Sequence, residues 1–351
     1  MKPESQVGPL RIAATFAGTI IGAGFASGQE IVQFFVSFGF PGLGGVLLAS
    51  LLFGWLGGRL LELGRKLKAT THSQAIYYLC GRRFGLLLDW ATSFFLFGTL
   101  SIMLAGAATV GRDYFDLPYL ASMTAASLAV AATVLCGVRG ISAANMIITP
   151  LLTLSIVGIS FYSFVYHPPD PSLLVVPSVP EQQAAPHWLL ASMLYVSYNL
   201  MISSTVLVPL GGTLRTRRAG FWGGAVGGLV LGALAALLAS VVMLHHPEIL
   251  SYEVPILEVA SRQHDVNSSV YAVTLLAAMY TTAIATLFGC ATKLKTTTGL
   301  PPAVAVPLLV LAALGCGQLG FANLIRLLFP LFGATAFWFT VRLACLAIRG
   351  R

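Results

Sequence analysis

A carboxylate and two adjacent hydroxyls stand inside long apolar stretches of this chain, where polar side chains are few. Glu30 closes a glycine-rich run that begins at Gly18, and Thr281 and Thr282 are neighbours in a distant apolar stretch. Two hydroxyls together with backbone carbonyls can ligate a hard cation. A carboxylate deep in an apolar span is by default a functional candidate, and Glu30 could carry a proton or contact a solute.

Each of these groups also has a purely structural explanation. Residues 27–30 read S-G-Q-E, the S-x-x-E form of a capping box, in which Ser27 is the N-cap and Glu30 the N3 residue of a helix. An acid is stabilised at a helix N-terminus. The hydroxyls of Thr281 and Thr282 could bond to carbonyls of their own helix. The sequence leaves both kinds of explanation open.

The element that must position Glu30 is a predicted span with a break in its middle. Glycine weakens a helix interior by about 1 kcal/mol, and four glycines fall between Gly18 and Gly28. We therefore predict two half-helices, 10–21 and 28–38, joined by unwound backbone. Such a break offers carbonyls to a cation and amides to an anion, as in many secondary transporters. A glycine-lined packing face between helices is the alternative.

The composition is that of a polytopic helical membrane protein in a lipid bilayer. Of 351 residues, 57% are hydrophobic and 9% are charged, against about 25% charged in soluble chains. The net charge of +8 does not indicate a nucleic-acid partner, because the basic residues fall in short loops between apolar spans. The five cysteines are scattered, without metal-ligand or disulfide spacing. With no catalytic motif either, we expect neither an enzyme nor a cofactor.

The apolar stretches predict ten spans, at residues 10–38, 43–63, 86–110, 119–136, 141–166, 188–210, 221–244, 270–291, 304–316 and 321–348. Of the 20 Lys and Arg residues, Arg112, Arg262 and Arg326 fall in loops on one side, which leaves 17 on the other. Cytoplasmic loops carry the excess of Lys and Arg. Both termini are therefore expected in the cytoplasm.

The spans divide into two halves of five. The first half is 1–166, a Pro-rich extracytoplasmic linker without Lys or Arg is 167–186, and the second half is 187–351. The sixth span contains polar residues at 195–199 and is predicted to break, as the first does. Because five is odd, the halves have opposite orientations, and inverted repeats place a site where the broken helices meet. We predict an all-α integral membrane fold, with ten transmembrane helices in a five-plus-five inverted repeat and broken first and sixth helices.

This layout resembles the LeuT-fold transporters of the amino acid–polyamine–organocation superfamily. Residues 18–31, G-T-I-I-G-A-G-F-A-S-G-Q-E-I, resemble the opening of the YkvI-type bacterial membrane proteins, which are placed near branched-chain amino acid symporters. The resemblance covers all ten spans, and its specific residues lie in spans one, six and eight.

The resemblance implies a sodium site between the first and eighth spans. Its ligands would be the carbonyls of Gly18, Ile21 and Ala278 and the hydroxyls of Thr281 and Thr282. Some proton-coupled members of the fold carry a lysine in the fifth helix instead. The fifth span here has no lysine, which favours sodium.

The resemblance also implies a solute site at the two helix breaks. In amino-acid members, amides of the first break hold the solute carboxylate. The corresponding residues, with those of the sixth span, are Gly22, Ala23, Gly24, Phe25, Tyr195, Ser197 and Asn199. An interhelical hydrogen bond is the plainer role for Asn199. Phe25 stands where a second sodium site of the fold has an amide side chain, so that second site is not supported.

We therefore expect a secondary transporter of the bacterial cytoplasmic membrane. It would use alternating access to import a small amino-acid-like solute with sodium as coupling ion. A proton-coupled transporter or exchanger that uses Glu30, and a membrane sensor of the same fold that does not transport, are the alternatives. The solute itself, the stoichiometry and the oligomeric state are left open by the sequence.

Overall fold

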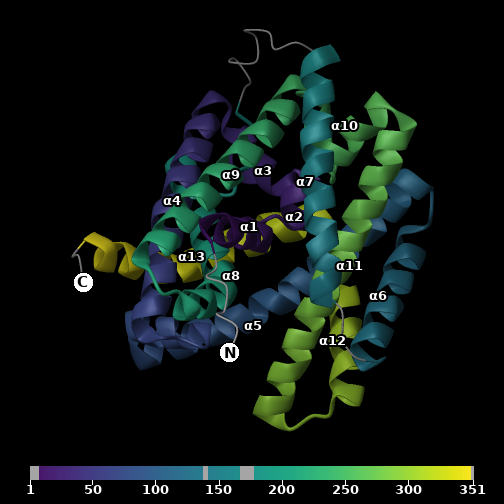
Figure 1. Ribbon diagram of the computed structural model, residues 1–351. Coiled ribbons are helices and arrows are strands. Elements are labelled where there is room, and N and C mark those ends of the chain that lie inside the picture. Colours follow the sequence, from purple (N-terminus) through teal and green to yellow (C-terminus); the bar gives the residue numbers. More distant parts are fainter. Residues whose placement is uncertain (1–7, 137–140, 167–177, 349–351) are drawn as a thin grey trace.

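The computed structural model describes residues 8–136, 141–166 and 178–348, which form a bundle of long helices (Figure 1). The chain ends, the turn at 137–140 and the first part of the predicted linker, 167–177, lie outside the described residues. The long apolar helices are α4 (Phe40–Leu67), α5 (His72–Phe115), α6 (Tyr119–Cys136), α7 (Ile141–Tyr166), α8 (Trp188–Thr213), α9 (Arg217–Leu244), α11 (Asp265–Thr298), α12 (Pro302–Gly317) and α13 (Phe321–Ile348).

Membrane-spanning character is confirmed by these helices. Within the described ranges, eight of them are long and apolar enough to cross a membrane, and α12 is a shorter apolar helix. The predicted spans correspond to these nine helices and to the interrupted first span, in the same order. The count of ten spans stays a prediction.

The first predicted span is interrupted, as expected, and its first half-helix ends within one residue of the predicted end at Ile21, but the helix restarts earlier than predicted. The span comprises α1 (Pro9–Ile20), α2 (Ala23–Ser27), α3 (Gln29–Phe34) and the 3₁₀ turn η1 (Val36–Phe38). The helix ends at Ile20, passes through extended backbone at Gly22 (φ −119°, ψ −174°), and restarts at Ala23.

The predicted restart at Gly28 is only a second kink, because α2 has already begun five residues earlier. Gly28 has φ +84°, a left-handed conformation that favours glycine. A Cβ atom on Gly28 would lie 2.7 Å from Cγ1 of Ile256, which packs over it from α10 (Pro255–Gln263). The kink is therefore fixed by a close tertiary contact.

The predicted break of the sixth span is wrong. Helix α8 continues from Trp188 to Thr213, and two of the polar side chains that pointed to a break bond to carbonyls of that same helix. Ser197 Oγ donates to the Met193 carbonyl at 2.6 Å, and Asn199 Nδ2 donates to the Tyr195 carbonyl at 3.0 Å. These local bonds satisfy the polar groups without unwinding the backbone.

Helices of the two halves interlock along glycines. Gly224 and Gly228 of α9 face Gly54 and Gly58 of α4 so closely that a Cβ atom on Gly228 would lie 2.2 Å from the Gly54 nitrogen. Helices α4, α8, α9 and α1 pack together on one side, and α5, α6, α11 and α12 on the other. Small residues permit this close approach of membrane helices. Between the two groups lies α2 (Figure 1).

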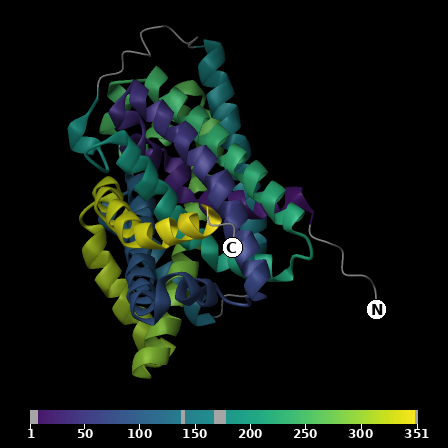
Figure 2. The same cartoon turned by 90° about the vertical axis from the view of Figure 1, so that its left-hand side faces the viewer.

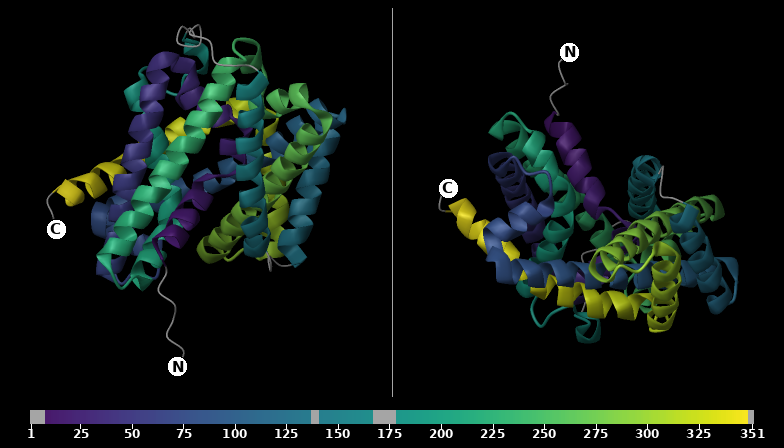
Figure 3. Two further views of the ribbon diagram at one scale, coloured as in Figure 1. Left: turned by 45° about the horizontal axis from the view of Figure 1, so that its top comes forward. Right: turned by 90° about the horizontal axis from the view of Figure 1, so that it is seen from below.

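The last helix crosses the outside of the bundle. Figure 2 shows α13 running across the face that carries the C-terminal end, and the view from below in Figure 3 shows it beside α5. It contacts both α5 and α8. Helix α13 thereby brings side chains to the region where the first span is interrupted.

Candidate functional site

A cavity of about 460 Å³ lies at the interruption between α1 and α2. Its walls come from α1, α2, α3, α5, α7, α8, α11 and α13. The predicted site residues that line it are Gly18, Ile21, Gly22, Ala23, Gly24, Glu30, Asn199, Ala278, Thr281 and Thr282. Residues from both halves of the chain therefore converge on one space.

Four of the predicted residues lie outside this lining. Phe25 and Ser197 are buried in the helix packing. Tyr195 is buried among the rings of Phe34, Phe35 and Phe53, with centroids 4.9–5.9 Å away. Ser27 donates its hydroxyl to the Gly24 carbonyl at 2.7 Å. Their assignment as solute or coupling residues remains a prediction.

Glu30 does not serve as a helix cap. The N-cap of α3 is Gly28, without a side-chain cap bond, so the predicted capping box of Ser27 and Glu30 is wrong. Ser27 Oγ accepts a hydrogen bond from the Gln29 amide at 3.2 Å, but the Glu30 carboxylate does not accept the reciprocal bond from the Ser27 amide that a capping box requires. Instead Glu30 Oε2 accepts the hydroxyl of Tyr198 from α8 at 2.5 Å.

The Glu30 carboxyl group is buried and borders the cavity. Glu30 is 6% exposed, and its other oxygen, Oε1, rests against the backbone of Gly24. A Cβ atom on Gly24 would lie 2.1 Å from that oxygen and 3.6 Å from Cε2 of Phe329. Glycine at position 24 is therefore what leaves room for the carboxylate.

Three aromatic rings form a wall of the cavity beside Glu30. We call Phe95, Tyr198 and Phe329 the ring wall; all three line the cavity. The Phe329 centroid lies 5.0 Å from that of Tyr198 and 5.5 Å from that of Phe95. The rings come from α8, α13 and α5. A carboxylate is thus set against a continuous aromatic surface.

Another part of the cavity lining gathers oxygen atoms that could hold a cation. In an unbroken helix the Gly18 carbonyl would accept the Gly22 amide; here that amide is donated to the Ile20 carbonyl at 2.8 Å. The Gly18 carbonyl is thereby released from its helical partner. Thr281 Oγ1 donates to the Ala278 carbonyl at 3.2 Å, which leaves the hydroxyl oxygen able to accept or ligate.

Sequence reasoning missed the ring wall. In the sequence, Tyr198 is one of several polar residues in the sixth span, and Phe95 and Phe329 have the ordinary spacing of core residues in a helix. Several cavity hydroxyls were missed for the same reason, since threonine is common in membrane helices. These are Thr19, Thr92, Thr99, Thr149, Thr205 and Thr286. Only the meeting of six helices in space distinguishes these side chains from others of their kind.

A cover closes the bundle on the side of the predicted linker. The Ala184 and Val179 amides donate to the carbonyls of Gln33 (3.0 Å) and Ser37 (2.8 Å), which ties the described part of the linker to α3 and η1. Beneath it, Tyr271 of α11 donates its hydroxyl to the Ala26 carbonyl. These bonds connect the described part of the linker and α11 to α2, α3 and η1 on this side of the bundle.

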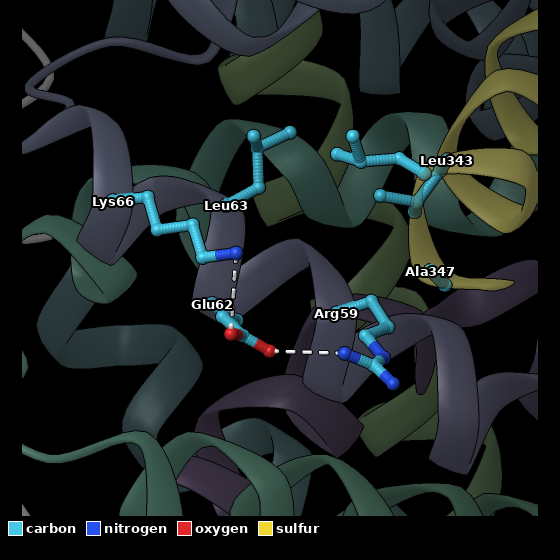
Figure 4. Close-up of a pocket in the computed structure, with 7 residues that line it drawn as sticks. Arg59, Glu62, Leu63, Lys66, Leu343 and Ala347 are labelled. Atoms are coloured by element: carbon cyan, nitrogen blue, oxygen red, sulfur yellow. Dashed lines mark hydrogen bonds and ion pairs between the residues drawn. The ribbon is translucent and has the colours of Figure 1, made fainter. Parts of the chain in front are cut away.

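A small pocket between α4 and α13 lies at the opposite end of the bundle (Figure 4). In Figure 4, Glu62 lies between Arg59 and Lys66, with N–O distances of 3.2 Å and 3.6 Å. Arg217 at the start of α9 also reaches Glu62, at 3.2 Å. The charges of this pocket are engaged with one another, and they tie α4 to α9.

Comparison with known proteins begins with sequence relatives. The chain is 26% identical over 346 residues to the uncharacterized membrane protein YkvI of Bacillus subtilis, with 97% of each chain covered. It is also 26% identical over 318 residues to the uncharacterized protein YyaD of the same organism, with 90% of each covered. No family model matches the chain. The predicted resemblance to YkvI-type membrane proteins is confirmed.

Solved structures with a similar fold are transport proteins. The Eremococcus coleocola manganese transporter has a TM-score of 0.59 at 17% identity, covering 95% of this chain and 78% of its own. The structure of MhsT in complex with L-phenylalanine has a TM-score of 0.59 at 15% identity, and the match covers 95% of this chain and 89% of MhsT. Mhp1, a nucleobase-cation-symport-1 family transporter, has a TM-score of 0.54 at 16% identity, and the match covers 94% of this chain and 77% of Mhp1. The chain has the LeuT-like fold.

Proposed function

We propose that this protein is a secondary active transporter that couples a sodium gradient to the movement of a small amino-acid-like solute. The observation that carries the proposal is the cavity at the α1–α2 interruption. There the freed carbonyl of Gly18 and the carbonyl of Ile21 share one space with Ala278, Thr281 and Thr282. This donor set suits a hard cation, and the same cavity has room for a solute.

The asymmetry of the cavity supports alternating access. Its lining on α7 comes from the half of that helix nearest Arg139, and its lining on α8 extends from Tyr198, near the middle of the helix, to Val206, toward the loop that carries Arg215, Arg217 and Arg218. The other side is covered by the linker segment and by α10. With the predicted topology, this arrangement corresponds to a cavity facing the cytoplasm. Release of the cover would expose the same cavity to the other side.

The cargo of the structural relatives is varied, so the chemistry of this cavity must guide the choice. Manganese prefers oxygen ligands from carboxylates, carbonyls and water, so a manganese cargo would favour a site with several carboxylates. Across 8–136, 141–166 and 178–348, no group of three or more His, Cys, Asp or Glu side chains is positioned to hold a metal. Glu30 is the single carboxylate in the cavity lining. An organic solute therefore fits better than a transition metal.

Thermal unfolding of the detergent-purified protein in sodium and in potassium, across a panel of amino acids, tests the proposal. A ligand that binds only the folded state raises the unfolding free energy by about 2.7 kcal/mol at a hundredfold excess over its Kd. We expect a shift with one solute class that requires sodium. Uptake of that solute by proteoliposomes should then follow an imposed sodium gradient. A solute shift without any uptake would instead identify a membrane sensor.

Proton coupling through Glu30 is the second candidate. It is favoured by the burial of Glu30 at the cavity without an ion pair among the described residues. In that case uptake would persist without sodium and respond to a pH gradient. The Glu30→Gln variant would lose that response, because the amide does not exchange a proton.

A further inference from the structure

We propose that the cavity recognises its solute through a positively charged amine, placed against the Glu30 carboxylate and the ring wall. The proposal rests on the transporter function proposed above and names the chemical class of the solute. That class is compact organic ammonium compounds, in which an accompanying carboxylate is optional. The resemblance to LeuT-fold transporters implies a leading role for the solute carboxylate; the contacts of this cavity assign that role to the amine.

The first argument is charge. No Lys, Arg or His occurs among the described residues that line the cavity, and Glu30 is its one acidic side chain. Glu30 is 6% exposed, and a buried charge is costly unless an opposite charge accompanies it. A cationic ligand would supply that charge. A ligand whose only charge is negative would instead place a like charge beside the carboxylate, which is unfavourable.

The second argument is the state of the amides that a carboxylate would need. Of the three predicted amides, at Gly22, Ala23 and Gly24, the first is already donated to the Ile20 carbonyl at 2.8 Å. The helix that follows, α2, has only five residues. The helix-terminus contribution expected for a carboxylate is therefore reduced here. No basic side chain of the described lining compensates for it.

The third argument distinguishes an organic ammonium from an inorganic cation. The rings of Phe329, Tyr198 and Phe95 line the cavity that the carboxylate borders. Aromatic faces attract ammonium groups, including alkylated ones, through the ring quadrupole. Sodium instead prefers a shell of oxygens, which this protein offers on α1 and α11. An alkyl ammonium gains from both the charge of Glu30 and the apolar rings.

The experiment compares matched trios in which only the charged groups change. One trio is 3-methylbutylamine, leucine and 4-methylpentanoate; the other is phenethylamine, phenylalanine and 3-phenylpropanoate. Each compound is titrated against the full-length wild-type protein in detergent, in sodium and in potassium, by thermal shift and calorimetry. We expect binding by at least one amine and its amino acid with Kd values within about tenfold, and no binding by the acid of that trio.

Variants locate the binding group. Glu30→Gln should weaken amine binding at least about tenfold, since it removes a charge-assisted contact. Phe329→Leu should weaken it about threefold or more, through loss of a ring face. The control is Glu181→Gln, the same carboxylate-to-amide change at an exposed residue of η3 (Pro180–Gln182) outside the cavity, and it should leave the Kd unchanged. If Glu30→Gln does not fold, Phe329→Leu and the wild-type trios still decide.

The outcomes separate this proposal from the proposed function. Binding of the acid without the amine, an unchanged amine Kd in Glu30→Gln, or no binding by any compound would overturn the amine assignment. If proteoliposomes accumulate the amino acid while the amine neither binds nor competes, the transporter stands and the assignment fails. If the amine binds as expected but no compound is transported, the amine site stands and the transporter proposal fails.

Discussion

The hydroxyl of Tyr198 on α8 donates a hydrogen bond to the carboxylate of Glu30 on α3, with 2.5 Å between the two oxygens. This bond joins the two halves of the chain inside the membrane-spanning bundle. It also holds the carboxylate beside the ring wall and against Gly24. The bond is a direct target for testing what Glu30 does.

Replacement of Tyr198 by Phe removes this bond and keeps the ring. The ring should still pack against Phe34 and Phe329, so we expect the fold to be retained. Because a hydrogen bond to a charged group contributes about 1.5–3 kcal/mol, solute affinity should fall about tenfold or more. Calorimetric titration measures it. Tyr119→Phe, which removes a phenol bond to the Gly317 carbonyl outside the cavity, is the matched control. Equal affinities of Tyr198→Phe and wild type would contradict the role of this bond.

Gly24→Ala tests the space that the carboxylate occupies. The new Cβ atom would lie 2.1 Å from Glu30 Oε1, so the carboxylate must move. Alanine is otherwise the better helix former by about 1 kcal/mol. We therefore expect a folded protein with solute affinity reduced at least about tenfold.

The control for this variant is Gly158→Ala on α7, where a Cβ atom meets nothing within 4 Å. It should leave the affinity unchanged. Wild-type affinity in Gly24→Ala would show that the position of the carboxylate does not matter. Both variants can be compared by titration with the same solute and by their thermal unfolding midpoints without it.

Thr281→Ala combined with Thr282→Ala tests the proposed cation site. Loss of both hydroxyls removes two oxygen donors, so the stabilisation by sodium over potassium should disappear while the helix remains. The unfolding temperature measured across a sodium titration gives the result. Thr124→Ala on α6, whose hydroxyl bonds to the Leu120 carbonyl on an exposed face, removes a similar intrahelical bond as a control. Sodium dependence that survives the double replacement would exclude this site.

Gly228→Ala tests the contact between α4 and α9. Its Cβ atom would lie 2.2 Å from the Gly54 nitrogen, and backbone cannot yield as a flexible side chain can. We expect a loss of about 1–3 kcal/mol in unfolding free energy, as for other overpacked sites. Gly44→Ala on α4, whose Cβ would lie 3.7 Å from the Trp188 ring, should cost much less. The two variants are compared by their denaturation midpoints in the same detergent. Equal midpoints would mean that α4 and α9 can move apart to accommodate the Cβ atom at position 228.

Much of the fold could be predicted because hydropathy and loop charge act over whole helices. The place where the first span restarts could not, because four glycines of similar propensity stand within residues 18–28. Contacts from elsewhere in the chain act on two of them: Gly24 makes room for Glu30 within α2, and the kink at Gly28 packs against Ile256. Neither contact is visible in the local sequence.

The error at the sixth span has a different physical cause. Polar residues at 195–199 resembled a disrupted helix, yet Ser197 and Asn199 find partners one turn back in α8. The sequence does not distinguish such a bond from a bond to a ligand. Tyr198 differs from its neighbours only because α3 brings Glu30 to it. When a site is assembled from several helices, its residues are therefore the part of the structure that is hardest to predict from the sequence.

The glycine contact between α4 and α9 has a consequence for how the molecule can change shape. Each helix comes from a different half of the sequence, yet their backbones meet without intervening side chains. Two helices in such close backbone contact would move together as one rigid unit. The boundary between moving parts would therefore not follow the linker at 167–186. That boundary would instead run through the cavity, which is lined by α1 and α8 together with α5 and α11. A bound solute would then lie between the parts that move relative to each other.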